Sequence, residues 1–159
     1  MEVAVARLEL RQGTFRGEKT GPNPTDRGKL GSKRHILTDQ RGTPLSAVIT
    51  GAQVHDMKAT MDTLDSIVVP RPPSRPYHLQ NLCLDKGYDF PEVEMGAIER
   101  GYVPHIRHRG EKRTGKRRHK PKRWVVERSA SWLNRFRKLL IRWEKKAENY
   151  LGLVQLVAA

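Results

Sequence analysis

The sequence has little of what disulfide cross-linking or membrane insertion requires. Its one cysteine, Cys83, excludes a disulfide framework within the chain and a zinc site built from several cysteines. No apolar stretch approaches the ~18–20 residues that a membrane-spanning helix needs. The first residues lack the basic-then-apolar pattern of a signal peptide. We therefore expect a soluble protein in a reducing compartment, with no membrane partner.

Acidic side chains are also few, mainly in the last third of the chain. The 159 residues include 31 Lys and Arg against 17 Asp and Glu, a net charge of +14. Residues 1–106 hold 14 basic and 13 acidic side chains, whereas residues 107–159 hold 17 and 4. Such an excess is uninformative about fold but favours a polyanionic partner. Because it is concentrated in the last third, we expect that part of the chain to bind nucleic acid.

The length and the order of the predicted elements indicate one mixed α/β domain. Turn-forming residues dominate the start of the chain, so we expect an irregular segment over 1–26, in which only residues 3–10 could form a short strand or helix, and a folded domain over 27–159. Short β-prone runs then alternate with helical periodicity. Asp56 is a suitable N-cap for the first helix. The expected strands cover 35–38, 44–50, 79–84 and 102–106, and the expected helices cover 57–67, 91–100 and 124–157.

A strongly basic segment separates the last strand from the last helix. Residues 107–123 contain ten Lys or Arg, one acid and no aliphatic residue, so we expect a mobile loop in the absence of a ligand. In the helix that follows, apolar residues recur every three or four positions, and we expect them to face the core. This apolar stripe consists of Trp132, Phe136, Leu139, Leu140, Trp143, Ala147, Tyr150 and Val154.

The cations of this loop and helix are the predicted DNA contacts, since Lys and Arg hold phosphates without reading sequence. RNA binding is a weaker alternative. The chain has only ten Phe, Trp and Tyr, and most of those in the C-terminal helix are expected in the core rather than available for stacking on bases. The predicted contacts are Arg107, Arg109, Lys112, Arg113, Lys116, Arg117, Arg118, Lys120, Lys122, Arg123, Arg128, Arg135 and Lys138.

Asp85 is the first candidate catalytic residue. It comes directly after the expected buried strand over 79–84. Ligands and catalytic groups gather at the C-terminal ends of strands in α/β sheets, and a carboxylate there can bind a hard cation such as Mg²⁺. The alternative is that Asp85 and Asp89 only build a turn, and the local sequence leaves both interpretations open.

Glu127 is the second candidate, as the only acid in a long basic stretch. At about 100° per residue, it belongs to a polar and accessible stripe of the predicted helix. The stripe consists of Glu127, Ser131, Asn134 and Lys138. Taken alone, Glu127 is better explained as a surface ion-pair partner of Arg123 or Arg128, an interaction that contributes little to stability.

Five short segments carry a combined signature. They are Gly17-Glu18-Lys19-Thr20-Gly21-Pro22-Asn23-Pro24-Thr25-Asp26-Arg27-Gly28-Lys29, Gly31-Ser32-Lys33-Arg34-His35, Gly51-Ala52-Gln53-Val54-His55-Asp56, Leu84-Asp85-Lys86-Gly87-Tyr88-Asp89 and Arg123-Trp124-Val125-Val126-Glu127-Arg128. In this order they resemble bacterial insertion-sequence transposases with a DDE catalytic triad. The resemblance covers roughly residues 15–157.

The resemblance implies a ribonuclease H-like fold, with a mixed sheet and flanking helices. It also implies three carboxylates that hold two divalent ions, Mg²⁺ or Mn²⁺, for in-line phosphoryl transfer on DNA. Asp85 matches the second carboxylate and Glu127 the third. The implied function is DNA transposition by strand cleavage and strand transfer, in the cytoplasm of a bacterium at the nucleoid.

The first catalytic Asp of the family has no counterpart here. In the family it lies on the first strand, before the Gly-Glu-Lys segment. In this chain no Asp precedes Asp26, and the only earlier acids are Glu2 and Glu9, so we expect the first strand to be incomplete. Lys120 occupies the position of a family tyrosine and Asn134 that of a family lysine. The cations that could replace this lysine are Arg135 and Lys138.

Two origins of the missing Asp are open: a truncated reading frame, or a second frame joined to an upstream one by frameshifting. In either case we expect the chain to lack the region that recognises transposon ends and to be inactive or crippled alone. Its protein partner would be a second copy or the upstream-frame product. The alternative function is a non-catalytic DNA-binding or inhibitory fragment that competes with the full-length transposase.

Overall fold

The computed structural model describes residues 2–9, 16–70, 72, 75, 79–108, 110 and 123–159, with the backbone only for 2–9 and Arg123. Among the described residues, no helix is long and apolar enough to cross a membrane. The strands are β1 (Glu2–Glu9), β2 (Gly21–Pro22), β3 (Leu30–Asp39), β4 (Pro44–Gly51), β5 (Gln80–Leu84) and β6 (Tyr102–Ile106). The helices are η1 (Asp56–Ala59), α1 (Thr60–Asp65), η2 (Lys86–Tyr88), α2 (Pro91–Glu99), α3 (Arg123–Leu133), α4 (Arg137–Leu140) and α5 (Ala147–Ala158), where η1 and η2 are short 3-10 turns.

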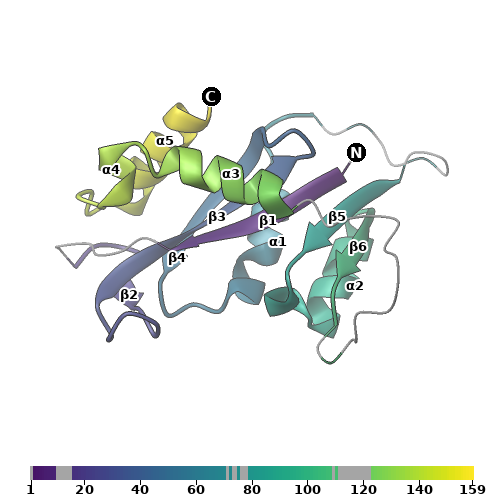
Figure 1. The fold of residues 1–159 in the computed structure, drawn as a ribbon, viewed down its shortest axis with the longest axis horizontal. Helices are drawn as coiled ribbons and strands as arrows, with labels where there is room; N and C mark the ends of the chain where they lie inside the picture. Colours follow the sequence, from purple (N-terminus) through teal and green to yellow (C-terminus); the bar gives the residue numbers. More distant parts are fainter. Residues whose placement is uncertain are drawn as a thin grey trace.

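The six strands form one mixed sheet (Figure 1). Strand β3 pairs with β4 on one side and with β1 on the other, antiparallel in both cases. Strand β1 also pairs in parallel with β5, which in turn pairs in parallel with β6. Helices cover the sheet, so the expected mixed α/β fold, a mixed sheet with flanking helices, is confirmed.

The beginning of the chain is more regular than expected: of the short strand or helix that residues 3–10 could form, the strand is present, and it is not an incomplete one. Residues 2–9 form an eight-residue strand, β1, in the interior of the sheet between β3 and β5. Hydrogen bonding to two neighbours, rather than local turn signals, determines the conformation of such a strand. Strand β3 also begins at Leu30, five residues earlier than predicted.

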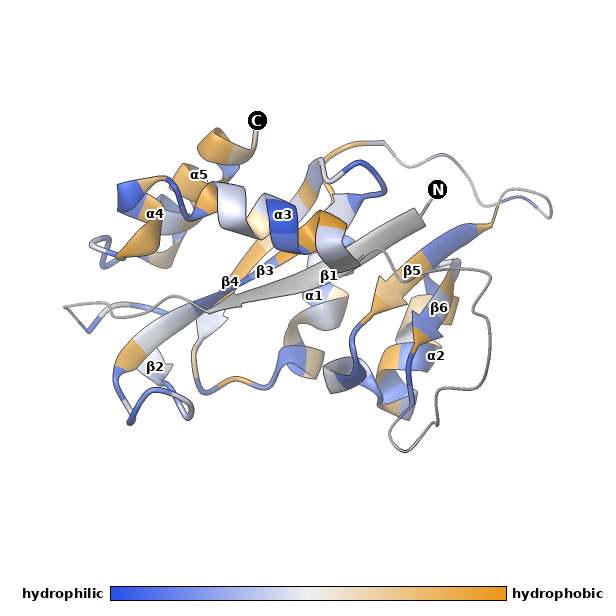
Figure 2. Cartoon of the chain, viewed as in Figure 1, coloured by the Kyte–Doolittle hydropathy of each residue, from blue (hydrophilic) through white to orange (hydrophobic). Residues whose placement is uncertain are grey.

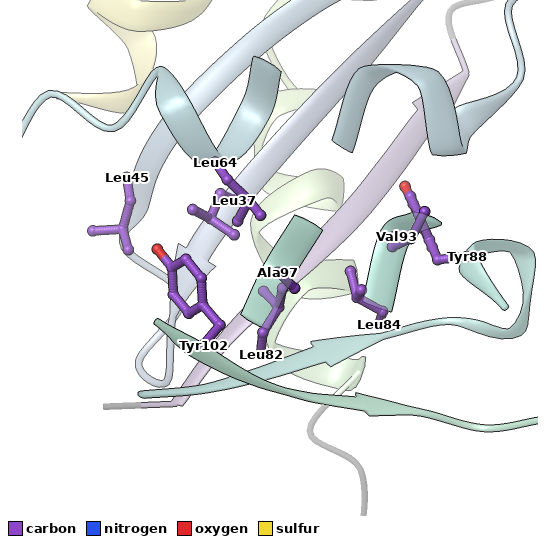
Figure 3. Packing of buried hydrophobic residues seen from close by; sticks show 9 residues of the cluster. All are labelled: Leu37, Leu45, Leu64, Leu82, Leu84, Tyr88, Val93, Ala97 and Tyr102. Atoms are coloured by element: carbon purple, nitrogen blue, oxygen red, sulfur yellow. The ribbon is translucent and has the colours of Figure 1, made fainter. Parts of the chain in front are cut away.

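Two apolar cores lie on opposite faces of the sheet, because neighbouring residues of a strand point to opposite faces. Leu37 of β3 packs with Leu82 of β5 and Val93 of α2 in the first core (Figure 3). The adjacent residue, Ile36, packs with Leu133 of α3 and with α5 in the second. Helices α1 and α2 therefore cover one face, and α3, α4 and α5 cover the other.

The prediction of one continuous C-terminal helix with an apolar stripe toward the core is wrong. The chain forms three helices in its place, and only part of the stripe is buried: Leu139, Ala147, Tyr150 and Val154. On α3 the buried residues include Val125, Val126, Ser129 and Leu133, which leaves Trp132 on the exposed side of the helix. Phe136, Leu140 and Trp143 are also exposed. Figure 2 accordingly shows hydrophobic and hydrophilic residues side by side on α3 and α4.

The Gly-Glu-Lys segment anchors the start of the folded region to the start of α5. The Glu18 amide donates to the carbonyl oxygen of Lys145 at 2.9 Å. A Glu18 carboxylate oxygen accepts from the Ala147 amide at 3.0 Å, at the first residue of α5. A Cβ at Gly17 would lie 2.7 Å from the same Lys145 oxygen, so this approach requires glycine. This segment of the signature thus has a structural role 129 residues away in the chain.

We predict that Glu18→Ala lowers the free energy of unfolding by about 1 kcal/mol, because it removes an acceptor and a negative charge from the N-terminus of α5. The matched control is Glu148→Ala. Glu148 is an exposed acid in the first turn of the same helix, 3.9 Å from the Lys146 ammonium, and we expect its loss to cost less than about 0.5 kcal/mol. Urea unfolding of the two variants measures the difference, and equal losses would contradict the anchoring role.

Candidate functional site

Asp85 lies where β5 ends, at the edge to which the sequence assigns it. Its backbone is still extended (φ −79°, ψ 166°), and its side chain accepts from the Lys86 amide at 2.7 Å, which caps η2. Leu82 and Leu84 point into the core beneath α1 and α2. By the alternation of the strand, Cys83 and Asp85 belong to the opposite face, the one that carries α3. Asp85 is exposed, so the capping bond and contact with a ligand are compatible.

An acid–histidine pair stands at the same edge. Asp89 follows η2, and His108 follows β6. The Asp89 Oδ1 atom lies 2.7 Å from Nδ1 of His108. Sequence spacing does not reveal the pair, because its members are 19 residues apart. The signal that could have found it is the parallel pairing of β5 with β6, which places Leu84 opposite Ile106 and brings the following residues together.

A buried ion pair supports the loop beside this edge. The Lys33 ammonium lies 3.1 Å from Asp56 Oδ1 and donates to the Val54 carbonyl oxygen at 2.7 Å, and both charged side chains are nearly buried. The expectation that Asp56 caps the helix is therefore wrong. His55 is the N-cap of η1, and its Nδ1 atom accepts from the Met57 amide at 3.4 Å.

His55 also connects η1 to the segment after Asp85. Its ring packs edge-on against Phe90, with the ring centroids 5.3 Å apart and the planes at 88°. Phe90 is the N-cap of α2, a few residues beyond η2. The segment that leads to Asp85 is thus flanked by η1, which the Lys33–Asp56 ion pair supports and the His55–Phe90 contact joins to the start of α2.

Glu127 is exposed on α3, and two neighbours on the helix connect it to the β3–β4 turn. Ser129 donates to the Gly42 carbonyl oxygen at 2.7 Å. Arg128 donates to the Arg41 carbonyl oxygen at 2.5 Å and lies 5.1 Å from the centre of the Trp124 ring. These contacts fix the rotation of α3, so that Val125 and Val126 are buried while Glu127 faces outward.

Strand β1 connects the elements that carry the two candidate carboxylates, Asp85 and Glu127. Helix α3 packs on β1 and β3, and β5, which leads to Asp85, is the other neighbour of β1 (Figure 1). Next to α3, the same face of β5 and β6 carries partly exposed Asn81 and Cys83 and exposed His105, whose Nε2 atom lies 2.8 Å from Asn81 Oδ1. Within the described part of the chain, no three His, Cys, Asp or Glu side chains come close enough to hold a metal ion.

The polar stripe predicted around Glu127 is only partly present. Helix α3 ends at Leu133, and Lys138 belongs to α4. Asn134 is half-buried, and its Oδ1 atom accepts from Nη2 of Arg34 at 2.6 Å. Arg34 is completely buried, and its burial lowers the pKa of the guanidinium. Asn134 therefore holds the end of α3 against β3 instead of facing a ligand.

A second buried arginine, Arg142, borders the same core. It donates to Ser32 Oγ at 2.7 Å and lies 5.3 Å from the centre of the Tyr150 ring. Burial raises the pKa of Tyr150 to about 12. Its hydroxyl group donates to the Leu139 carbonyl oxygen at 3.0 Å. These residues bind the sheet to α4 and α5 and are structural parts of the site's support.

The structure places only some of the predicted DNA-binding cations. Arg128, Arg135 and Lys138 are exposed, Arg107 is half-buried after β6, and Arg123 begins α3. The other predicted contacts lie outside the described residues: Arg109, Lys112, Arg113, Lys116, Arg117, Arg118, Lys120 and Lys122. The segment that contains them starts at the edge that carries Asp85 and ends at the helix that carries Glu127.

We predict that Lys33→Met lowers the free energy of unfolding by about 3 kcal/mol, because it leaves the Asp56 carboxylate in a nearly buried place without its nearby cation. A second change, Asp56→Leu, in the same chain should restore part of the loss. Arg100→Met is the control: the Arg100–Asp65 contact is as short as 2.6 Å, but Asp65 is largely exposed, so we expect a loss below about 1 kcal/mol. Thermal or urea unfolding measures both losses, and equal losses in the two single variants would contradict the supporting role of the buried pair.

Comparison with known proteins identifies the family. A model described as "Transposase DDE domain" matches residues 11–159. A Burkholderia cepacia protein, named as a transposase for insertion sequence element IS402, is 42% identical over 142 residues. The match covers 87% of this chain and 65% of that protein. A structure of the piggyBac transposase synaptic complex with hairpin DNA aligns with 70% of this chain and 24% of its own, at 17% identity and a TM-score of 0.44. The family model, which matches residues 11–159, establishes that this chain belongs to the DDE transposase domain family.

Proposed function

We propose that this chain is the catalytic part of a DNA transposase and supplies two of its three metal-binding carboxylates, Asp85 and Glu127. The observation that carries the proposal is their placement. Asp85 follows β5, the parallel neighbour of β1, and Glu127 is exposed on α3, the helix that packs over β1. Both belong to the same side of the sheet. Family membership adds DNA transposition as the general function.

The donor chemistry of this pair suits Mg²⁺ or Mn²⁺, which prefer carboxylate oxygens. The number of donors does not suit these ions, because among the described residues no three possible ligands lie close together. Two carboxylates hold such ions poorly, because a missing direct ligand weakens binding more than a missing outer-shell partner, which already costs about 10–100-fold. We therefore propose no reaction step through a metal in the chain as it stands.

The pairing of β1 indicates where the third carboxylate would stand. Ala4 pairs with Cys83, so two residues further along the parallel register Ala6 is level with Asp85. Ala6 also pairs with Ile36, whose side chain lies in the core beneath α3 and α5. Position 6 therefore belongs to the face of the sheet that carries Asp85 and α3. An alanine occupies it, and Glu2 and Glu9 are respectively four and three residues away along the strand.

The exposed cations on and after α3 bind DNA in this proposal. Arg128, Arg135 and Lys138 are exposed cations on or after α3, and the partly exposed face of β5 and β6 lies beside this helix. Cations so arranged hold the phosphate backbone next to Asp85 and Glu127. The chain alone then binds DNA with little or no cleavage. The alternative is a non-catalytic DNA-binding or inhibitory fragment. Such a fragment would also bind DNA, but its function would not require Asp85 and Glu127.

A gain-of-function variant distinguishes the catalytic proposal from the non-catalytic alternative. We predict that Ala6→Asp confers Mn²⁺-dependent nicking of supercoiled plasmid DNA, at least about tenfold above the unchanged chain, because it completes the set of three carboxylates. Adding Asp85→Asn or Glu127→Gln to this variant should abolish the gain. Glu92→Gln, which removes an exposed acid at the start of α2, is the control and should leave it unchanged.

Two results would contradict the proposal. One is a folded Ala6→Asp variant that binds DNA but nicks no faster than the unchanged chain. The other is robust metal-dependent nicking by the unchanged chain that persists after Asp85→Asn. Circular dichroism and a DNA-binding measurement on each variant separate a loss of chemistry from a loss of folding.

A further inference from the structure

An exposed aromatic pair lies at the end of α3, where a buried stripe is expected from the sequence. Trp132 is 42% exposed and Phe136 is 39% exposed. Their rings meet edge to face, with centroids 5.3 Å apart and planes at 81°. The contact holds each ring in place while leaving part of its surface open. We call Trp132 and Phe136 the aromatic pair.

The surroundings of the aromatic pair are strongly basic. No Asp or Glu occurs between Glu127 and Glu144. The exposed cations around the pair are Arg128, one helical turn before Trp132, and Arg135, Arg137 and Lys138, which flank Phe136 in the sequence. Arg142, the remaining cation of this stretch, is buried in the contacts with Ser32 and Tyr150. The pair is thus an apolar surface within a positively charged one.

A second copy of this chain would not suit such a surface, because it would bring its own excess of positive charge. A strand of nucleic acid suits both parts of it. Phosphates neutralise the cations, and base faces stack on aromatic rings without regard to sequence. In a continuous duplex the base faces are stacked on each other, and inserting a ring between them costs about a few kcal/mol per step, so a ring reaches base faces most easily where bases are unpaired.

We propose that the aromatic pair stacks on unpaired bases of a DNA strand held along α3, while the neighbouring cations hold its phosphates. The proposal rests on the proposed function, which supplies DNA as the partner, and it adds that the bound DNA has unpaired bases at this point. Trp132 lies five residues beyond Glu127 on the same helix, about 140° further around its axis, so the stacked bases would lie on a neighbouring side of α3 and not directly over this carboxylate.

The test compares three ligands that differ in their bases. The first is a fluorescent oligothymidylate of about 20 nucleotides, longer than the ~4–16 nucleotides that a single-strand-binding module covers. The second is a strand of the same length built from abasic sugar analogues, which has the phosphates but no bases. The third is a duplex of equal length. Fluorescence anisotropy with the complete chain in buffer containing a chelator gives the three affinities without cleavage.

The variant Trp132→Leu/Phe136→Leu should bind oligothymidylate about tenfold more weakly or worse, because stacking on at least one base is lost. Its affinity for the abasic strand and for the duplex should change by less than about twofold, and the salt dependence should be unchanged, since no phosphate contact is removed. Trp132→Phe should retain most of the affinity. The apolar control is Leu156→Ala on α5, which is 73% exposed and should have no effect.

The charge control is Arg135→Gln/Lys138→Gln. It should weaken binding of all three ligands and lower the salt slope by about 0.7 for each lost contact with the single strand. A measurement on the unchanged chain covers the case in which the double leucine variant does not fold. Photo-crosslinking to an oligonucleotide that contains 5-iodouracil, followed by mass spectrometry, should locate the crosslink at Trp132 or Phe136.

The proposal is overturned if the double leucine variant is folded and binds oligothymidylate as the unchanged chain does, or if it loses affinity for all three ligands equally. Crosslinks confined to other residues, or an unchanged chain that binds none of the ligands, would also overturn it. Failure of the Ala6→Asp variant to nick DNA, together with a base-dependent loss here, would reject the catalytic proposal and leave this one standing.

Discussion

The pairing of β1 with two neighbours is the interaction on which the rest of the molecule depends. On one side β1 joins β3 in an antiparallel ladder, and on the other it joins β5 in parallel. Without it, the β3–β4 hairpin and the β5–β6 pair would be separate pieces, each too small to bury a core. Helix α3 also packs on β1. The strand therefore sets the spacing between the edge that carries Asp85 and the helix that carries Glu127.

The support around the site consists of polar contacts that the apolar cores alone do not provide. Lys33 and Asp56 hold η1 beside the end of β5, Arg34 and Asn134 hold the end of α3, and Arg142 holds the segment before α5. Buried charged groups such as Lys33 and Arg34 are costly to desolvate, and their hydrogen bonds require defined geometry. The signature segments of the sequence contribute most to this support, so resemblance to the family reflects architecture as well as chemistry.

Local sequence patterns predict the elements whose signals are local. Strand β4, strand β6 and helix α2 lie close to the expected ranges, since turn residues, alternation or a proline at the first helical position mark them. Asp85 can be found because an apolar run reveals the end of a buried strand. The mixed fold class follows from the order of these elements and from the family resemblance.

Features determined by distant residues cannot be predicted in the same way. The sequence leaves strand or helix open for the start of the chain, because β1 owes its conformation to partners on β3 that are at least 24 residues away. Asp56 has the position of a helix cap, but Lys33 lies close enough to attract it. Periodicity identifies an apolar stripe after Trp124 without showing where the helix ends, so it assigns Trp132 and Phe136 to the core although they are exposed. The Asp89–His108 pair depends on strand pairing in the same way.

The ties between the early and late parts of the chain affect how it becomes structured during synthesis. Ser32 and Arg142 are 110 residues apart, Arg34 and Asn134 are 100 apart, and Glu18 and Ala147 are 129 apart. Contacts of such separation slow folding, because a long loop must close before they can form. The face of β3 beneath α3–α5 is therefore without its cover until α5 has left the ribosome. At ~5–20 residues per second, the segment from β6 to α5 takes several seconds to be made. During that time Ile36 and Ile49 lack the side chains that cover them in the finished fold, and such exposed apolar surface favours aggregation.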